Sequence, residues 1–364
     1  MSENSDDDDD DLSRKESDYF KKIMGKEVSD AELNIMKNLE KIKNIEENKN
    51  IKELRLNTSE LILSEQRKIY LIPKFGLKDV SPIFVFDEKT GNINRLILYG
   101  WQEVKIPRVG FAFVVLPDGN MYFFGGKKRQ SGKTSGSADY FNPLTGNFVR
   151  FKHEMSDDRY DATAVALSSK EILIIGGYRN QNLTKIADSC EIFNTETEVF
   201  TDVIKRMSYT RSGCAAVLLA NGKVLITGGN MVRPGSISLP NERYLSGEWD
   251  VSLKRLDTTE TYDPATKTFS RGPDMLLARS GHTATLLLSG EVLICGGFKD
   301  SAELYDPVKN KFFRLQDMIV YRENHMASIL NNGDVLVYGG DERLSSEIFD
   351  HKTKKFHMHR HNIW

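Results

Sequence analysis

Five arginines recur at a constant distance from five glycine pairs, and they are the most regular source of potential chemistry in the sequence. Each stands seventeen residues before the first glycine of its pair: Arg108, Arg159, Arg211, Arg279 and Arg322. A guanidinium group carries a planar fork of N–H donors that suits carboxylates and phosphates. Such a repeat predicts a ring of cations that grips an acidic ligand. The alternative is that some of these arginines bond carbonyl groups or carboxylates of their own chain.

Three long segments follow glycine pairs. The first two add cations, namely Lys127, Lys128, Arg129, Lys133, Arg179 and Lys185. The segment 127–137 contains no acidic residue, whereas 230–258 has balanced charges and includes aromatic residues of the kind that anchor protein interfaces. The predicted partner-binding set therefore joins the five arginines with Lys127, Lys128, Arg129, Tyr244 and Trp249.

Residues that could support catalysis are few and scattered. A copper radical site needs tyrosine and histidine ligands with a partnering cysteine, but Cys190, Cys214 and Cys295 lie far apart. Three alternating histidines from His357 to His361 could bind a metal adventitiously. No nucleophile-elbow, paired-carboxylate or zinc-protease spacing appears. We therefore predict no catalytic residue, no functional metal site and no cofactor.

Two apolar strands must lie between each arginine and its glycine pair. The second strand of each pair ends at the glycines, as in Val224-Leu-Ile-Thr-Gly228-Gly229. Turn sequences such as Asn221-Gly222 join the two strands, because glycine and asparagine adopt the positive φ of tight hairpins. If each arginine begins an innermost strand, the arginines, the glycine pairs and the long loops share one face.

A second signature follows each glycine pair. An aromatic residue precedes Asp or Asn, and an apolar residue stands six positions after that acid or amide. The six copies begin at Phe86, Phe141, Phe193, Tyr262, Tyr305 and Phe349. The first half of the repeat has only five clear copies, since the run Lys68–Ile72 ends at Gly76 without a glycine pair.

These two signatures together resemble the kelch repeat, over about 300 of the 364 residues. The final aromatic, usually Trp in kelch repeats, is Phe or Ile here. The resemblance implies an all-β propeller of four-stranded blades around a channel, and six half-repeats predict six blades. In kelch adaptors, arginines at similar strand starts grip acidic peptides, which is what the resemblance implies for the five arginines here. Other kelch-like propellers are copper oxidases or sugar isomerases.

Charge and composition divide the chain into three parts. Residues 1–30 hold eleven acidic and five basic side chains, whereas the rest carries a net charge of +4. We expect a disordered acidic tail over 1–12 and two short α-helices within 13–56, before a propeller over 57–364. The helices either dock on the same chain or contact a partner through residues 13–49. The Asp6–Asp11 run could fold back on the basic face as an internal competitor.

The sequence contains no run of about 18 apolar residues that would cross a membrane and no secretory signal. Three widely spaced cysteines favour a reducing compartment, so we predict a cytoplasmic protein with a nuclear location possible. The small positive charge of the propeller region makes nucleic acid an unfavoured partner. The leading hypothesis is a non-catalytic module that binds an acidic segment of a partner protein. The alternative is a kelch-like sugar isomerase or oxidase with its site at the channel mouth.

Overall fold

The computed structural model describes residues 68–71, 83–96, 108–128, 132–142, 147–179, 185–232, 253–341 and 343–359. The chain divides into two units, Met1–Leu54 and Arg55–Trp364, and all the described residues belong to the second. The predicted acidic tail and helical segment therefore lie outside the described residues. Within these ranges the regular structure is all β-strand, and no helix is present that could span a membrane.

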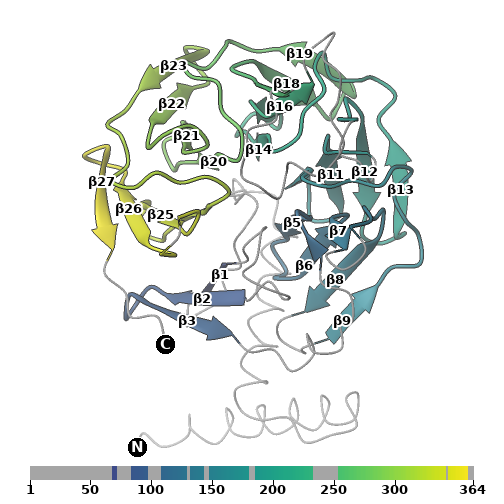
Figure 1. Cartoon of the computed structure of the whole chain (residues 1–364), viewed down its shortest axis with the longest axis horizontal. Coiled ribbons are helices and arrows are strands. Elements are labelled where there is room, and N and C mark those ends of the chain that lie inside the picture. The colour runs from purple at the N-terminus through teal and green to yellow at the C-terminus, as the bar shows by residue number, and fades with distance from the viewer. Residues whose placement is uncertain are drawn as a thin grey trace, which may run out of the picture. The chain divides into compact units, whose positions relative to one another are not determined.

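Five antiparallel four-stranded sheets repeat along the chain and form the blades of a propeller (Figure 1). The first blade contains β5 (Ala112–Val115), β6 (Met121–Phe124), β8 (Ala138–Asn142) and β9 (Asn147–Arg150). The second contains β10 (Thr163–Ala166), β11 (Glu171–Ile175), β12 (Cys190–Asn194) and β13 (Val199–Asp202). The third contains β14 (Ala215–Leu218), β15 (Val224–Thr227), β18 (Thr259–Asp263) and β19 (Thr268–Arg271).

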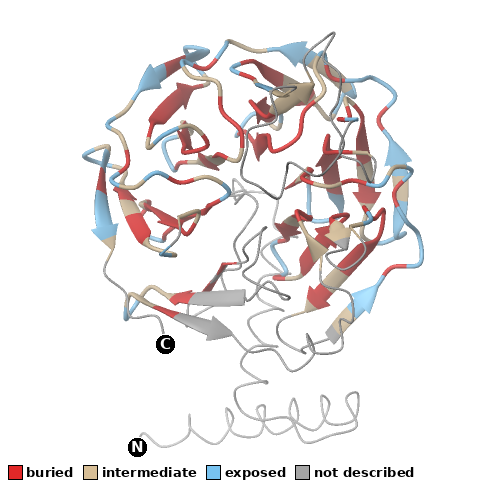
Figure 2. Ribbon diagram, in the orientation of Figure 1, coloured by how far each residue is buried: buried red, intermediate tan, exposed pale blue. Residues whose placement is uncertain are grey.

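The last two blades keep the same order. The fourth contains β20 (Thr283–Leu286), β21 (Val292–Cys295), β22 (Ala302–Asp306) and β23 (Lys311–Arg314). The fifth contains β24 (Met326–Ile329), β25 (Val335–Tyr338), β26 (Ser346–Asp350) and β27 (Lys355–His359). The first strands of successive blades contact one another in the series β5, β10, β14, β20 and β24. Each blade therefore runs from the centre outward, and burial falls in the same direction (Figure 2).

The expectation of six blades is wrong for the described residues. The half-repeat that begins at Phe86, the first along the chain, forms only a three-stranded sheet. This sheet contains β1 (Lys68–Leu71), β2 (Ile83–Asp87) and β3 (Asn92–Leu96), and we call it the first sheet. This first sheet packs on the fifth blade, where Ile69 and Leu71 share a buried cluster with Leu336 and Tyr338. His359 Nε2 of the fifth blade also donates to the Gly91 carbonyl at 2.8 Å.

The aromatic–acid signature forms the outer hairpin of each blade. In the third blade Tyr262 lies opposite Phe269, with 5.0 Å between ring centroids. The next residue, Asp263, accepts hydrogen bonds from the backbone N–H groups of Ala265 and Thr266 and so closes the turn. Asn194, Asp306 and Asp350 close equivalent turns. An acid or amide recurs here because its short side chain satisfies two donors of the turn.

Two short ribbons extend the blades on the side of the glycine pairs. One consists of β4 (Arg108–Val109) and β7 (Lys127–Lys128), and the other of β16 (Asn230–Val232) and β17 (Leu253–Arg255). The second ribbon begins directly after the glycine pair of the third blade and returns before β18. It therefore belongs to the face that carries the long loops.

Candidate functional site: the loop face

The repeated arginines lie inside the blades. Arg159, Arg211, Arg279 and Arg322 are at most 1% exposed. Arg211 is representative: its Nη1 donates to the Gly228 and Thr258 carbonyls at 2.7 and 2.9 Å. Its Nη2 donates to the Thr258 hydroxyl at 3.0 Å, and Nε and Nη2 both reach Glu260. These contacts use every N–H group of the guanidinium, which leaves no donor for a partner.

The other arginines repeat this arrangement. Each Nη1 donates to the carbonyl of the first glycine of its own pair, at 2.7 to 2.8 Å. Arg108 is slightly less covered, with 7% of its side chain exposed, and it pairs with Asp139. The structure thus agrees with the alternative that the arginines bond their own chain. Their burial argues against a direct grip on a partner, because a guanidinium that leaves its acid would strand a buried charge.

The acids that hold these arginines were missed in the sequence. They stand two residues before each repeated aromatic, as Asp139, Glu191, Glu260, Glu303 and Glu347. The signal was available, because all five units with an arginine have such an acid. The first sheet has Phe84 at this position and no matching arginine. The absence of this arginine and acid from its sequence agrees with its reduced architecture.

The four glutamates of this set also fix the loop that enters their blades. The second carboxylate oxygen of Glu260 accepts the Ser208 N–H at 2.7 Å. In the fifth blade Glu347 accepts the N–H groups of Ile319 and Val320 at 2.7 and 3.1 Å. One carboxylate therefore joins the arginine to the connection from the preceding blade.

The glycine pairs join neighbouring blades. The Gly177 N–H donates to the carbonyl of Arg211 in the next blade at 2.8 Å. A Cβ on Gly176 would overlap that same carbonyl oxygen. The other three junctions between successive blades repeat this N–H bond, at 2.7 to 2.9 Å. A side chain is excluded here because two backbones approach closely, so the pair has a packing role rather than a phosphate-binding role.

A second set of backbone hydrogen bonds connects each blade to the next, and we call this set the mouth ladder. Its members stand two residues after each arginine and all have positive φ, namely Gly110, Asp161, Gly213, Gly281 and Asn324. From Asp161 onward, each N–H donates to the carbonyl of the preceding member, at 2.7 to 2.9 Å. The left-handed conformation turns these groups toward the neighbouring blades, which fixes the order of the five blades around the channel.

The central channel is narrow. It holds a cavity of about 130 Å³ lined mainly by alanine and threonine with Cys214 and His282. His282 Nε2 bonds the Thr227 hydroxyl at 2.7 Å, and burial holds its pKa well below the usual value. Burial also raises the pKa of the Cys295 thiol to about 11. Burial therefore favours the uncharged form of both groups.

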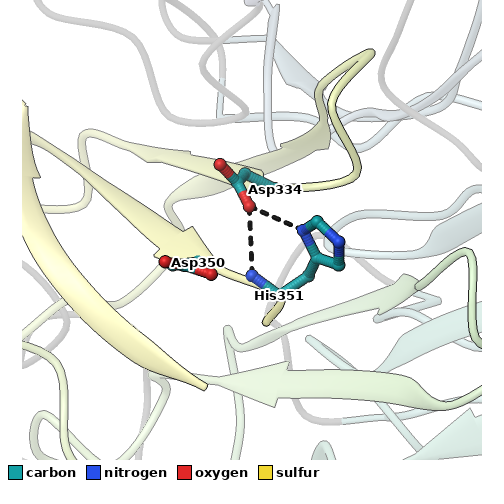
Figure 3. Close-up of side chains that lie close together, drawn as sticks. All are labelled: Asp334, Asp350 and His351. Atoms are coloured by element: carbon teal, nitrogen blue, oxygen red, sulfur yellow. Dashed lines mark hydrogen bonds and ion pairs between the residues drawn. The ribbon is translucent and has the colours of Figure 1, made fainter. Parts of the chain in front are cut away.

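One acidic cluster could in principle hold a cation. Asp334, Asp350 and His351 offer ligand atoms within 4.8 Å of one another (Figure 3). His351 Nδ1 lies 2.8 Å from Asp334 Oδ1, which also accepts the His351 backbone N–H. Asp350 Oδ1 closes its own hairpin turn. The visible role of this cluster is to connect two hairpin turns of the fifth blade.

The remaining predicted contact residues are placed unevenly. Lys127 and Lys128 form β7, opposite Val109 and Arg108 of β4. Lys133 is exposed near the same loop. Arg129, Tyr244 and Trp249 lie outside the described residues.

A groove of about 780 Å³ opens on the loop face between the second and third blades. Arg179 and Lys185 of the second blade line it, together with the apolar side chains of Ile186, Met231 and Val232. Arg179 is paired with Asp157 at 2.5 Å, and its side chain is 35% exposed. Asp157 also lines the groove and offsets one of the two cations, so a small excess of positive charge lies beside apolar surface in a cavity large enough for a peptide segment.

Comparison with known proteins adds no further constraint. No protein-family model matches the chain, and no curated protein matches it either. The described residues form an all-β propeller with five complete blades, and that is the conclusion on which a function can be built.

Proposed function

We propose that this chain is a kelch-type propeller that acts as a non-catalytic protein-interaction module. It binds an acidic segment of a partner protein on the loop face. The observation that carries the proposal is the groove between the second and third blades, where Arg179 and Lys185 adjoin Ile186, Met231 and Val232. Rigid blades that carry variable loops are a common arrangement for binding surfaces.

The location of the binding charge differs from the sequence-based expectation. The buried arginines support the fold, and the groove cations take over the role of attracting the acidic segment. Such exposed charges favour encounter and specificity more than affinity. Apolar contacts with the groove wall then contribute most of the affinity.

Binding of a defined peptide by the full chain tests this function. The probe is a fluorescein-labelled twelve-residue peptide of alternating Glu and Val, and the control peptide alternates Lys and Val. We expect saturable binding of the Glu–Val peptide only, measured by fluorescence anisotropy, and weaker binding as salt rises. Equal binding of both peptides, or binding of neither, contradicts the proposal.

A matched pair of variants locates the binding face. Lys185→Glu reverses an exposed charge in the groove, whereas Lys267→Glu reverses an exposed charge in the β18–β19 turn at the opposite end of the strands. We expect Lys185→Glu to weaken binding about fivefold and Lys267→Glu to change it less than twofold. Equal effects of the two variants would remove the assignment to the loop face.

A further inference from the structure

The groove lies between two β-ribbons. On one side the chain after the glycine pair of the second blade folds back on itself, with Tyr178 paired to Ile186. On the other side β16 pairs with β17. Tyr178, Ile186, Val232 and Leu253 belong to one apolar cluster beneath the groove. The two walls are thus formed by strands that run along the groove.

One edge of β16 faces the groove and, at Val232, has no partner strand among the described residues. Asn230 exchanges two backbone hydrogen bonds with Ser212 on this edge, at 2.7 and 3.1 Å. Backbone groups of a strand alternate between its two edges, so Val232 presents its N–H and C=O on the same edge as Asn230. In the part of the chain that the structure describes, no strand pairs with β16 there at Val232.

Continued antiparallel pairing of Ser212 with Asn230 would place Thr210 opposite Val232. Arg211, which precedes Ser212, donates its N–H to the Ala187 carbonyl of the second blade at 3.0 Å. Ser208 is held by Glu260. The segment 208–211 is thus bonded to other parts of the blades, and within the described residues no strand bond joins Thr210 to Val232. Ser208, Thr210 and Val232 all line the groove.

We propose that the acidic segment binds here in an extended conformation and adds to β16 as a further strand. The inference rests on the proposed function and specifies how that function is carried out. Side chains of an added strand alternate between two directions. One set meets the apolar side chains of Ile186 and Val232, which belong to one cluster, and the other meets the charges of Arg179 and Lys185. The site therefore selects segments in which acidic and aliphatic residues alternate.

Backbone modification of the probe distinguishes strand addition from side-chain binding. A series of Glu–Val peptides carries a single N-methyl group at successive positions. An added strand uses the N–H of every second residue, so N-methylation in one alternate set should weaken binding at least tenfold. N-methylation in the other set should change it less than threefold. These effects are measured by anisotropy with the full chain.

A protein variant tests the same edge from the other side. Val232→Pro removes the N–H that faces the groove, and proline is tolerated at an open strand edge. We expect at least tenfold weaker peptide binding with an unchanged unfolding midpoint. Val232→Ala is the matched comparison, because it trims the same side chain but keeps the backbone N–H, so the binding that Val232→Pro loses beyond Val232→Ala reports the N–H.

The outcomes separate this inference from the proposed function. If the parent peptide binds and neither N-methylation nor Val232→Pro weakens it in the alternate pattern, strand addition is overturned and the binding function stands. If the parent peptide does not bind at all, the proposed function fails and the inference fails with it. If Val232→Pro loses binding and its unfolding midpoint is also lowered, the N-methylated peptides decide, because they are tested with the unaltered protein.

Discussion

At the scale of the residue, the repeated arginines and the neutral histidines His282 and His325 both contribute to the folded structure. Both lie in the interior and bond groups of the chain itself. His325 Nε2 lies 2.9 Å from the Thr283 hydroxyl of the preceding blade, and burial lowers its pKa to about 3, with smaller contributions from Arg322 and Arg279. The arginines that suggested a binding ring are here structural, because their guanidinium groups bond carbonyl groups and carboxylates of their own blades.

The histidines should make stability depend on pH. The unfolded chain takes up a proton on His325 near pH 6.5, whereas the folded chain resists it down to about 3. The free energy of unfolding should therefore fall as the pH drops below about 6.5, by about 1.4 kcal/mol per pH unit for this histidine. Urea unfolding between about pH 7 and pH 5 measures the slope.

The variant His325→Gln should show a shallower slope over this range, because it no longer binds the proton in the unfolded state. His153→Gln is the control, since His153 is exposed and bonds a carbonyl at the surface. Identical slopes in His325→Gln and the unaltered protein would show that His325 does not control this pH dependence.

At the scale of the element, the sequence predicted more of the fold than of the site. Its spacings located both strands of each inner hairpin and the outer hairpin at Tyr262 and Phe269, because register and turn chemistry are local. No local pattern around Arg211 shows that it faces inward, since its partner Glu260 is contributed by a strand far along the chain. Only the repeated acid before each aromatic residue carries that signal. Local patterns also could not reveal the groove, because its lining comes from segments far apart in the sequence.

The glycine pairs offer a matched test of packing between blades. A Cβ on Gly176 would overlap the backbone of Arg211, whereas one on Gly339 would meet only Leu344 at 3.7 Å. Both glycines have positive φ, at 62° and 71°. Gly339→Ala should cost about 1 kcal/mol from backbone strain alone. Gly176→Ala should cost at least about 2 kcal/mol more, because the two backbones must separate.

Urea unfolding of the two variants measures these losses against the unaltered protein. A similar loss in both variants would indicate that the junction between the second and third blades tolerates a side chain. The pair is informative because strain is common to both positions and only the neighbouring backbone differs.

At the scale of the whole molecule, one junction differs from the others. Successive blades are linked by glycine N–H bonds and by the mouth ladder. Among the described residues, the first sheet instead meets the fifth blade through side chains of Ile69, Leu71 and His359. The expected sixth blade thus corresponds to the segment that contains β1, β2 and β3, whose sequence lacks the repeated arginine, acid and glycine pair.

Native-state hydrogen exchange should reveal this difference. We expect amides of β2 to exchange through openings of lower free energy than amides of β11, because the described first sheet has three strands rather than four and its sequence lacks the repeated arginine and acid. Exchange measured by mass spectrometry on peptides covering 83–96 and 171–175 provides the comparison. Equal protection of the two segments would show that the first sheet opens only when the whole propeller unfolds.

The pairing of each arginine with an acid of its own blade has a consequence for how such a chain can change in length. Every complete repeat brings one buried positive charge together with its buried negative charge, as in Arg279 and Glu303. Duplication or deletion of a whole repeat therefore leaves the interior electrically neutral. A partial duplication would strand a charge in the interior and would be eliminated by instability. The ring is thus built from units that can be gained or lost in evolution only as wholes.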